Sequence, residues 1–225
     1  MAERMIITVT NMKGGVGKST VAVHLCWWLS QRGYRVTLAD CDMQESSSEW
    51  VEEACPGVKS VRFTNPNDIM NKLPELLEDA DFVIADGPGS QTETSRSLLL
   101  RSHLAIVPCK ASMLEIRALS RATEVLRQSQ DVRPNNLPQA VIVLSMVGKN
   151  YKLTKDMKEA AALLNLPMAK TPLVLRQVYA DAPGQGAIVS QFGARGREAA
   201  AEIEALFAEI LPQVAIKRKS RKLVA

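Results

Sequence analysis

Short, mostly apolar runs recur along the chain, each six or seven residues long. Continuous runs of this kind are typical of parallel strands that are buried on both faces. They predict strands over 5–10, 34–40, 58–63, 81–86, 103–108 and 140–146. A further segment, 168–175, predicts a seventh strand or the remains of one around Pro172.

Between these runs, apolar residues fall at helical spacing. The predicted helices occupy 19–32, a short segment beginning at 46–50, 67–79, 92–101, 113–130, 153–164 and 195–211. We expect a bend at Pro74, and the turn-rich segment 131–138 is too short to be a domain linker. The alternation predicts one α/β domain over 1–212, a doubly wound and mostly parallel sheet flanked by helices. A basic tail would follow over 213–225.

Composition places the chain among ordinary globular proteins, with 225 residues, 46% hydrophobic and 23% charged. No stretch approaches the ~20 apolar residues of a membrane span, and the N-terminus lacks a signal-peptide pattern. We therefore expect a cytoplasmic protein. Cys26 and Cys109 lie in apolar stretches, so we expect small buried hydrophobes rather than disulfides or zinc ligands. His24 and His103 are likewise expected to be structural.

The segment between the first strand and the first helix is rich in glycine. Glycines allow backbone N–H groups to converge on an anion, and the following helix N-terminus adds a partial positive charge. Lys18 would reach the β- and γ-phosphates of a nucleotide, and the Ser19 hydroxyl would bind Mg²⁺. The residues expected to hold the phosphate tail are Gly14, Gly15, Val16, Gly17, Lys18, Ser19 and Thr20.

Acidic residues end two of the predicted strands. Asp40 and Asp42 end or follow the second strand, and Asp86 ends the fourth, just before a Gly-Pro pair. The carboxyl ends of parallel strands are where ligands bind in open α/β sheets. An apolar strand that ends in Asp is typical of a Walker-B carboxylate beside Mg²⁺.

The sequence Lys13-Gly-Gly-Val-Gly-Lys-Ser-Thr20 resembles the deviant Walker-A motif of the ParA/MinD family of P-loop ATPases. Met12 stands where the common P-loop pattern has its first glycine. Asp40 to Gln44 resembles the family's D-x-D-P-Q motif, with Met43 in place of proline. Asp86 to Gly89 resembles its D-x-P-P segment, with Gly89 in place of the second proline.

The resemblance implies a role for several of these residues. Lys13 would reach across a dimer interface to the partner's nucleotide, and Asp42 would orient the hydrolytic water. Asp40 would support Mg²⁺ through water, and the cofactors would be ATP and Mg²⁺. By the same resemblance, adenine contacts are expected from Met146, Pro172 and Leu173.

The basic residues of the chain are concentrated at its end. Lys217, Arg218, Lys219, Arg221 and Lys222 carry five positive charges; removing them from the net charge of +4 leaves −1 for the rest. This run is either a solvated tail, a non-specific DNA-binding segment extended by Arg195 and Arg197, or a weak membrane contact. Beyond it, Leu223 and Val224 are the only large apolar side chains in the sequence, too little apolar area for a stable membrane anchor.

The resemblance is closest to small ParA-type partition and positioning ATPases. It implies an ATP-dependent homodimer that binds nucleoid DNA non-specifically and is stimulated by a ParB-like or cargo-adaptor protein. The cargo would be a plasmid, a chromosome or a carboxysome-like organelle. The alternatives are a MinD-like membrane-cycling spatial regulator and, third, a metabolic P-loop enzyme.

Overall fold

The computed structural model describes residues 4–43, 46–89, 93–110, 112, 123–148, 159, 161–162 and 165–215. Its centre is one six-stranded sheet with the order β3-β2-β4-β1-β5-β6, and every pair of neighbouring strands is parallel. The strands are β1 (Met5–Val9), β2 (Val36–Asp40), β3 (Lys59–Arg62), β4 (Phe82–Asp86), β5 (Leu104–Lys110) and β6 (Gln139–Ser145). The expected doubly wound α/β fold is confirmed.

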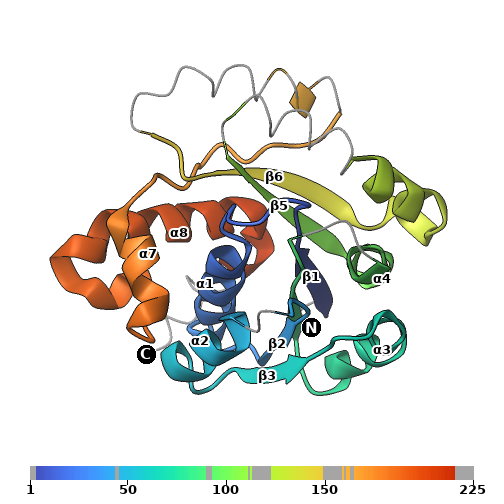
Figure 1. Ribbon diagram of the computed structural model, residues 1–225, viewed down its shortest axis with the longest axis horizontal. Helices are drawn as coiled ribbons and strands as arrows, with labels where there is room; N and C mark the ends of the chain where they lie inside the picture. Colours follow the sequence, from blue (N-terminus) through green and yellow to red (C-terminus); the bar gives the residue numbers. More distant parts are fainter. Residues whose placement is uncertain are drawn as a thin grey trace.

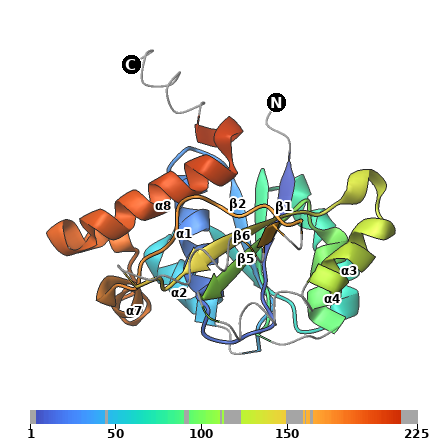
Figure 2. The ribbon, with the colours of Figure 1, turned by 90° about the horizontal axis from the view of Figure 1, so that it is seen from above.

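Helices cover both faces of the sheet (Figures 1 and 2). The α-helices whose two ends both lie within the described residues are α1 (Lys18–Ser30), α2 (Ser46–Ala54), α3 (Pro66–Lys72), α4 (Glu93–Arg101), α7 (Gln177–Gly184) and α8 (Arg197–Ile210). The 3-10 segments are η1 (Pro74–Glu78), η2 (Pro134–Asn136) and η3 (Val189–Gly196). Figure 1 shows α1, α2, α7 and α8 on one face of the sheet and α3 and α4 on the other.

The largest core cluster lies beneath α1, α2, α7 and α8 and includes Trp28, Phe82 and Phe207, none more than 1% exposed. A second cluster lies beneath α3 and α4 and is built on residues such as Ile69 and Val83. Because both faces are covered, the central strands are mostly apolar, and every residue of β2 and β4 is buried, including the aspartates that end them.

The strand register brings the polar strand ends together. Val9, the last residue of β1, pairs with Asp86 of β4, and Asp86 pairs with Asp40 of β2. The chain leaves β1 for β2 on one side and later returns to β5 on the other. The loop after β1 therefore lies at a switch point of the sheet, where open α/β folds bind ligands.

The structure refines three expectations. The segment 168–175 keeps only the remains of a strand: single parallel bridges join Met168 to Ile142 and Val174 to Val147, and the N–H of Leu173 donates to the carbonyl of Leu144 at the outer edge of β6 (2.8 Å). The helical stretch expected over 67–79 changes at Pro74 as expected, where the α-helix that ends at Lys72 gives way to a 3-10 turn. The last helix begins at Arg197 and not at 195, since Arg195 lies in η3.

Two further predictions fall partly outside the described residues. Of the helix expected over 113–130, residues 123–130 are helical, and of the one over 153–164, residues 159, 161 and 162 are helical. Val214 is buried in the main core cluster. The division at 212 stays a prediction, because most of the basic tail lies outside the described residues.

The cysteines and histidines have the structural environments that the sequence indicated. All four cysteines are buried free thiols. The backbone N–H of Ile6 donates to His103 Nδ1 (2.9 Å), and that of Val189 donates to His24 Nε2 (3.1 Å). Within the described ranges, none of the helices is both long and apolar enough to span a membrane.

Candidate nucleotide-binding site

The loop between β1 and α1 adopts a conformation that favours glycine. Gly15 and Gly17 have φ angles of +68° and +89°, in the left-handed region that residues with a Cβ rarely adopt. Gly17 is the N-cap residue of α1 and has no capping side chain. The first N–H groups of α1 therefore have no side-chain cap, which suits them to an anion.

Two buried polar side chains hold this loop against the strands beside it. Asn11 Nδ2 donates to the carbonyl of Pro108 (2.6 Å), and Asn11 Oδ1 accepts from the N–H of Lys13 (3.0 Å). Ser145 Oγ, at the end of β6, donates to the carbonyl of Val16 (2.7 Å). Sequence motifs did not identify Asn11 or Ser145, because neither belongs to the phosphate-binding pattern.

Lys18 lies inside the site rather than on its surface. The side chain is 7% exposed, and Nζ donates to the carbonyl of Lys13 (3.1 Å). Burial lowers the pKa of the Lys18 ammonium, while the charges of Asp86 and Asp42 act in the opposite direction. A cation that is held out of water in this way gains most from a bound anion.

Asp40 and Asp86 are both buried, but their hydrogen bonding differs. The two oxygens of Asp40 accept from the N–H of Asp42 (3.1 Å) and of Ser48 (2.9 Å). Asp40 thereby shapes the turn that carries Asp42. Neither oxygen of Asp86 has a hydrogen-bond partner within the described ranges.

The environment of Asp86 suits a bound divalent cation. Burial raises the pKa of Asp86 to about 7, and the charge of Asp40 adds to this. The nearby hydroxyls of Ser19 and Ser47, which are not placed for well-formed hydrogen bonds, and the charge of Lys18 lower it. A carboxylate without partners, beside a serine hydroxyl, provides the oxygen ligands that Mg²⁺ prefers. Among the described residues, no cluster of three or more Asp, Glu, His or Cys side chains could hold a metal. A Mg²⁺ ion here would therefore need oxygens from a nucleotide and water, which is its usual coordination.

Gly89 lets the chain after β4 approach the phosphate loop closely. A Cβ at Gly89 would lie 3.2 Å from Gly14 Cα and 3.3 Å from Lys18 Nζ. The loops after β1 and β4 are thus in contact. A displacement of one loop will therefore displace the other.

A cavity of about 270 Å³ opens beside the phosphate loop at the ends of β6 and α7. Gly17 and Thr20 line it together with Met146 and Leu173, two of the expected adenine contacts. Pro172 is not among its lining residues, and its base contact remains a prediction. Sequence reasoning missed the other side of the cavity, which Leu175, Arg176, Tyr179, Ala180 and Pro183 provide.

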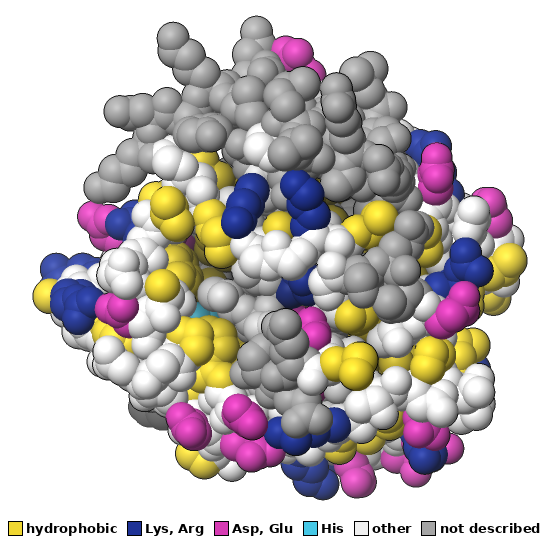
Figure 3. Space-filling model, in the orientation of Figure 1, with side chains coloured by type: hydrophobic (Ala, Val, Ile, Leu, Met, Phe, Trp, Pro, Cys, Tyr) yellow, Lys and Arg dark blue, Asp and Glu magenta, His cyan; other side chains and the backbone are white. Residues whose placement is uncertain are grey.

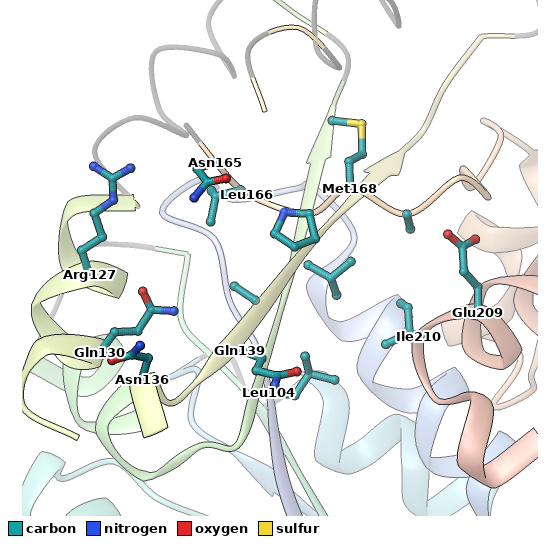
Figure 4. Close-up of a pocket in the computed structure, with 14 residues that line it drawn as sticks. Leu104, Arg127, Gln130, Asn136, Gln139, Asn165, Leu166, Met168, Glu209 and Ile210 are labelled. Carbon is teal, nitrogen blue, oxygen red and sulfur yellow. The ribbon is translucent and has the colours of Figure 1, made fainter. Parts of the chain in front are cut away.

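A larger cavity of about 510 Å³ lies elsewhere, at the amino ends of β5 and β6 (Figure 4). Leu104 and Gln139, the first residues of these strands, line it, with Arg127 on one side and Glu209 on the other. No glycine or Ser/Thr of the phosphate loop borders it. The smaller cavity, which is continuous with that loop, is therefore the candidate nucleotide site.

The expected DNA-binding residues are only partly described. Arg195 Nη2 forms an ion pair with Asp181 (2.6 Å), so part of its charge is balanced within the protein. Arg197 is exposed, and 217–222 lie outside the described residues. On the face shown in Figure 3, basic and acidic side chains are interspersed around the rim, with further basic side chains near the centre.

Comparison with known proteins agrees with this geometry. A family model described as "CobQ/CobB/MinD/ParA nucleotide binding domain" matches residues 7–189. The chain is 30% identical over 210 residues to "Maintenance of carboxysome distribution protein A" of Halothiobacillus neapolitanus, covering 92% of this chain and 96% of that protein. It is 24% identical over 178 residues to "Protein ParA" of Rhizobium radiobacter, covering 77% and 80% of the two chains.

Solved structures share the fold. Apo McdA from Cyanothece has a TM-score of 0.75 at 17% identity and covers 95% of this chain and 99% of its own. The cell division ATPase MinD of Pyrococcus furiosus has a TM-score of 0.71 at 18% identity, with coverages of 94% and 99%. The family match over 7–189 decides the assignment: the chain belongs to the CobQ/CobB/MinD/ParA nucleotide-binding family.

Proposed function

We propose that this protein is a Mg²⁺-dependent ATPase that dimerises with ATP and distributes a large cargo, such as a plasmid or a carboxysome-like assembly, over nucleoid DNA. The observation that carries the ATPase proposal is the buried carboxylate of Asp86, which accepts no well-formed hydrogen bond from the described residues and lies beside Lys18 and a left-handed glycine loop. A metal-bound polyphosphate suits this arrangement, because its phosphates can pair with the buried ammonium and its metal ion with the buried carboxylate.

The residues of the site would have separate roles in ATP hydrolysis. The N–H groups of 14–20 and the Lys18 ammonium would bind the phosphate tail, and Ser19 and Asp86 would hold Mg²⁺. When bound, Mg²⁺ would neutralise charge that develops on the phosphate oxygens. Asp42, on the turn that Asp40 supports, would orient the attacking water. Substituting Asp42→Ala should retain ATP binding and abolish turnover; normal hydrolysis by this variant would exclude the assigned role.

The proposed dimer depends on Lys13. ATP can drive association only through contacts that it makes in the dimer and not in the monomer. The Lys13 side chain would supply such a contact to the partner's nucleotide. In analytical sedimentation with Mg²⁺ and a non-hydrolysable ATP analogue, the wild type should form a dimer and Lys13→Ala should not. Lys59→Ala, which removes an exposed lysine at the start of β3, is the matched control.

The cargo proposal draws on the names of the relatives. One is a carboxysome distribution protein at 30% identity, and another is named ParA. A dimer would double the basic tail and so strengthen a non-specific, salt-sensitive attachment to DNA. A protein adaptor on the cargo would then stimulate hydrolysis and release. The proposed site of action is the nucleoid of the cytoplasm.

Co-sedimentation with DNA or with anionic liposomes, each with and without ATP, tests this proposal. We expect ATP-dependent binding to DNA that weakens steeply with added salt. ATP-dependent binding to liposomes alone would favour a membrane-cycling regulator of the MinD kind. ATP binding with neither partner would favour a metabolic P-loop enzyme.

A further inference from the structure

Lys110, the last residue of β5, lies against the phosphate loop although it belongs to none of the loop's motifs. Its Nζ lies 4.0 Å from the point that a Cβ on Gly15 would occupy. Since Gly15 has no side chain and a φ of +68°, the loop presents bare backbone toward this ammonium. The Lys110 side chain is half-buried, and its ammonium has no hydrogen bond or ion pair with any described residue.

The backbone that carries Lys110 is fixed relative to the loop on two sides. Asn11 ties the start of the loop to Pro108, two residues before Lys110 in β5. On the other side, Lys110 pairs in register with Ser145, whose hydroxyl binds the carbonyl of Val16. The ammonium therefore reaches the loop from a position that the buried hydrogen bonds maintain.

We propose that Lys110 is an additional phosphate-binding residue, which contacts the terminal phosphates of the nucleotide held by its own loop. This inference rests on the proposed ATP binding. Lys18 approaches the loop from α1, on the side where Gly89 lies, and Lys110 approaches Gly15 from β5. The phosphate tail would lie between the two ammonium groups. A half-buried cation that has no carboxylate partner in the described part of the chain gains a charge-assisted hydrogen bond when a phosphate binds.

The test measures binding of a non-hydrolysable ATP analogue with Mg²⁺ to the full chain by titration calorimetry, at several salt concentrations. The variants are Lys110→Gln, Lys110→Arg and the control Lys59→Gln. Lys110→Gln should weaken binding about tenfold, as expected for loss of one charge-assisted contact, and should flatten the dependence of affinity on salt. Lys110→Arg should recover most of the affinity, and Lys59→Gln should match the wild type.

The other outcomes exclude either the proposed role of Lys110 or the proposed function itself. If the wild type binds the analogue and Lys110→Gln binds it equally well, the role of Lys110 is excluded while the proposed ATPase stands. If the wild type itself does not bind, the proposed function fails first. The Lys110→Gln variant could also bind the analogue normally as a monomer and then fail to dimerise. That result would exclude our proposal, because it would show that the ammonium contacts the partner's nucleotide. A fall in melting temperature with unchanged salt dependence would show a structural role instead.

Discussion

Asp40 and Asp86 are register partners on neighbouring strands, yet only Asp40 has hydrogen-bonded carboxylate oxygens. The backbone N–H groups of Asp42 and Ser48 satisfy Asp40, so its charge is part of the folded turn. Asp86 is equally buried and has no such donors among the described residues. The two carboxylates should therefore respond in opposite ways to neutralisation.

Substituting Asp86→Asn should raise the melting temperature of the nucleotide-free protein by several degrees at pH 8. Burial raises the pKa of Asp86 to about 7, so above this pH the fold must hold a carboxylate that would be better solvated in water. The same variant should lose the stabilisation that Mg²⁺ and ATP give to the wild type. Differential scanning fluorimetry with and without the ligand measures both effects.

Asp40→Asn is the matched comparison and should lower the melting temperature. An amide can replace only one of the two acceptor oxygens that Asp42 and Ser48 use, so one buried N–H group is left unsatisfied. Equal shifts of the same sign for the two asparagine variants would contradict this distinction.

Substituting Gly89→Ala should weaken binding of Mg²⁺ and an ATP analogue by about threefold or more, since small displacements of binding groups are costly. The added Cβ would lie 3.2 Å from Gly14 Cα and 3.3 Å from Lys18 Nζ, so the phosphate loop must shift to accommodate it. Gly57→Ala is the control, because a Cβ there meets no atom within 4 Å. Titration of both variants against the analogue decides the point, and equal affinities would refute it.

Acid should destabilise the fold through His24. Burial lowers the pKa of His24 to about 4, while an unfolded histidine titrates near 6.5. Between these two values the unfolded chain binds more protons than the folded one, so stability rises with pH across this window and is constant above it. The whole window corresponds to about 3 kcal/mol.

Urea denaturation at pH 4.5, 5.5 and 7 measures this dependence, because linear extrapolation yields the unfolding free energy at each pH. His24→Gln should be less stable at pH 7, since it loses the bonds to Thr20 and Val189, but its stability should vary less with pH below 6.5. A slope equal to that of the wild type would show that other groups dominate.

Met146→Ala should weaken ATP binding several-fold. It should leave unchanged the affinity for inorganic tripolyphosphate, a ligand that has phosphates but no base. Met146 is 37% exposed, and its Cε lies 3.9 Å from the point that a Cβ on Gly17 would occupy. Its thioether side chain can pack against a base but has no hydrogen-bond donor for a phosphate. Val132→Ala removes another exposed apolar side chain away from the site and serves as the control. Competition assays with the two ligands separate base contacts from phosphate contacts.

The local sequence pattern was sufficient to predict the phosphate loop and the buried strands, because glycine-rich segments and continuous apolar runs each have a strong local signal. The sequence also placed Asp40 and Asp86 at strand ends. It could not reveal that one is satisfied and the other is not, since that depends on the N–H of Ser48, eight residues further on. Asn11, Ser145 and Lys110 went unnoticed for the same reason: their contacts cross between strands that are distant in sequence.

The strand order has a consequence for how this protein can diversify. β1 lies between β4 and β2, which carry the buried aspartates, and β5 and β6, which carry Lys110, Ser145 and the approach to the base cavity. The proposed turnover residues and the proposed base contacts thus lie on opposite wings of one sheet, which the glycine loop joins. Under the proposed function, substitutions beside the aspartates would change the rate of hydrolysis and leave the choice of base to the other wing.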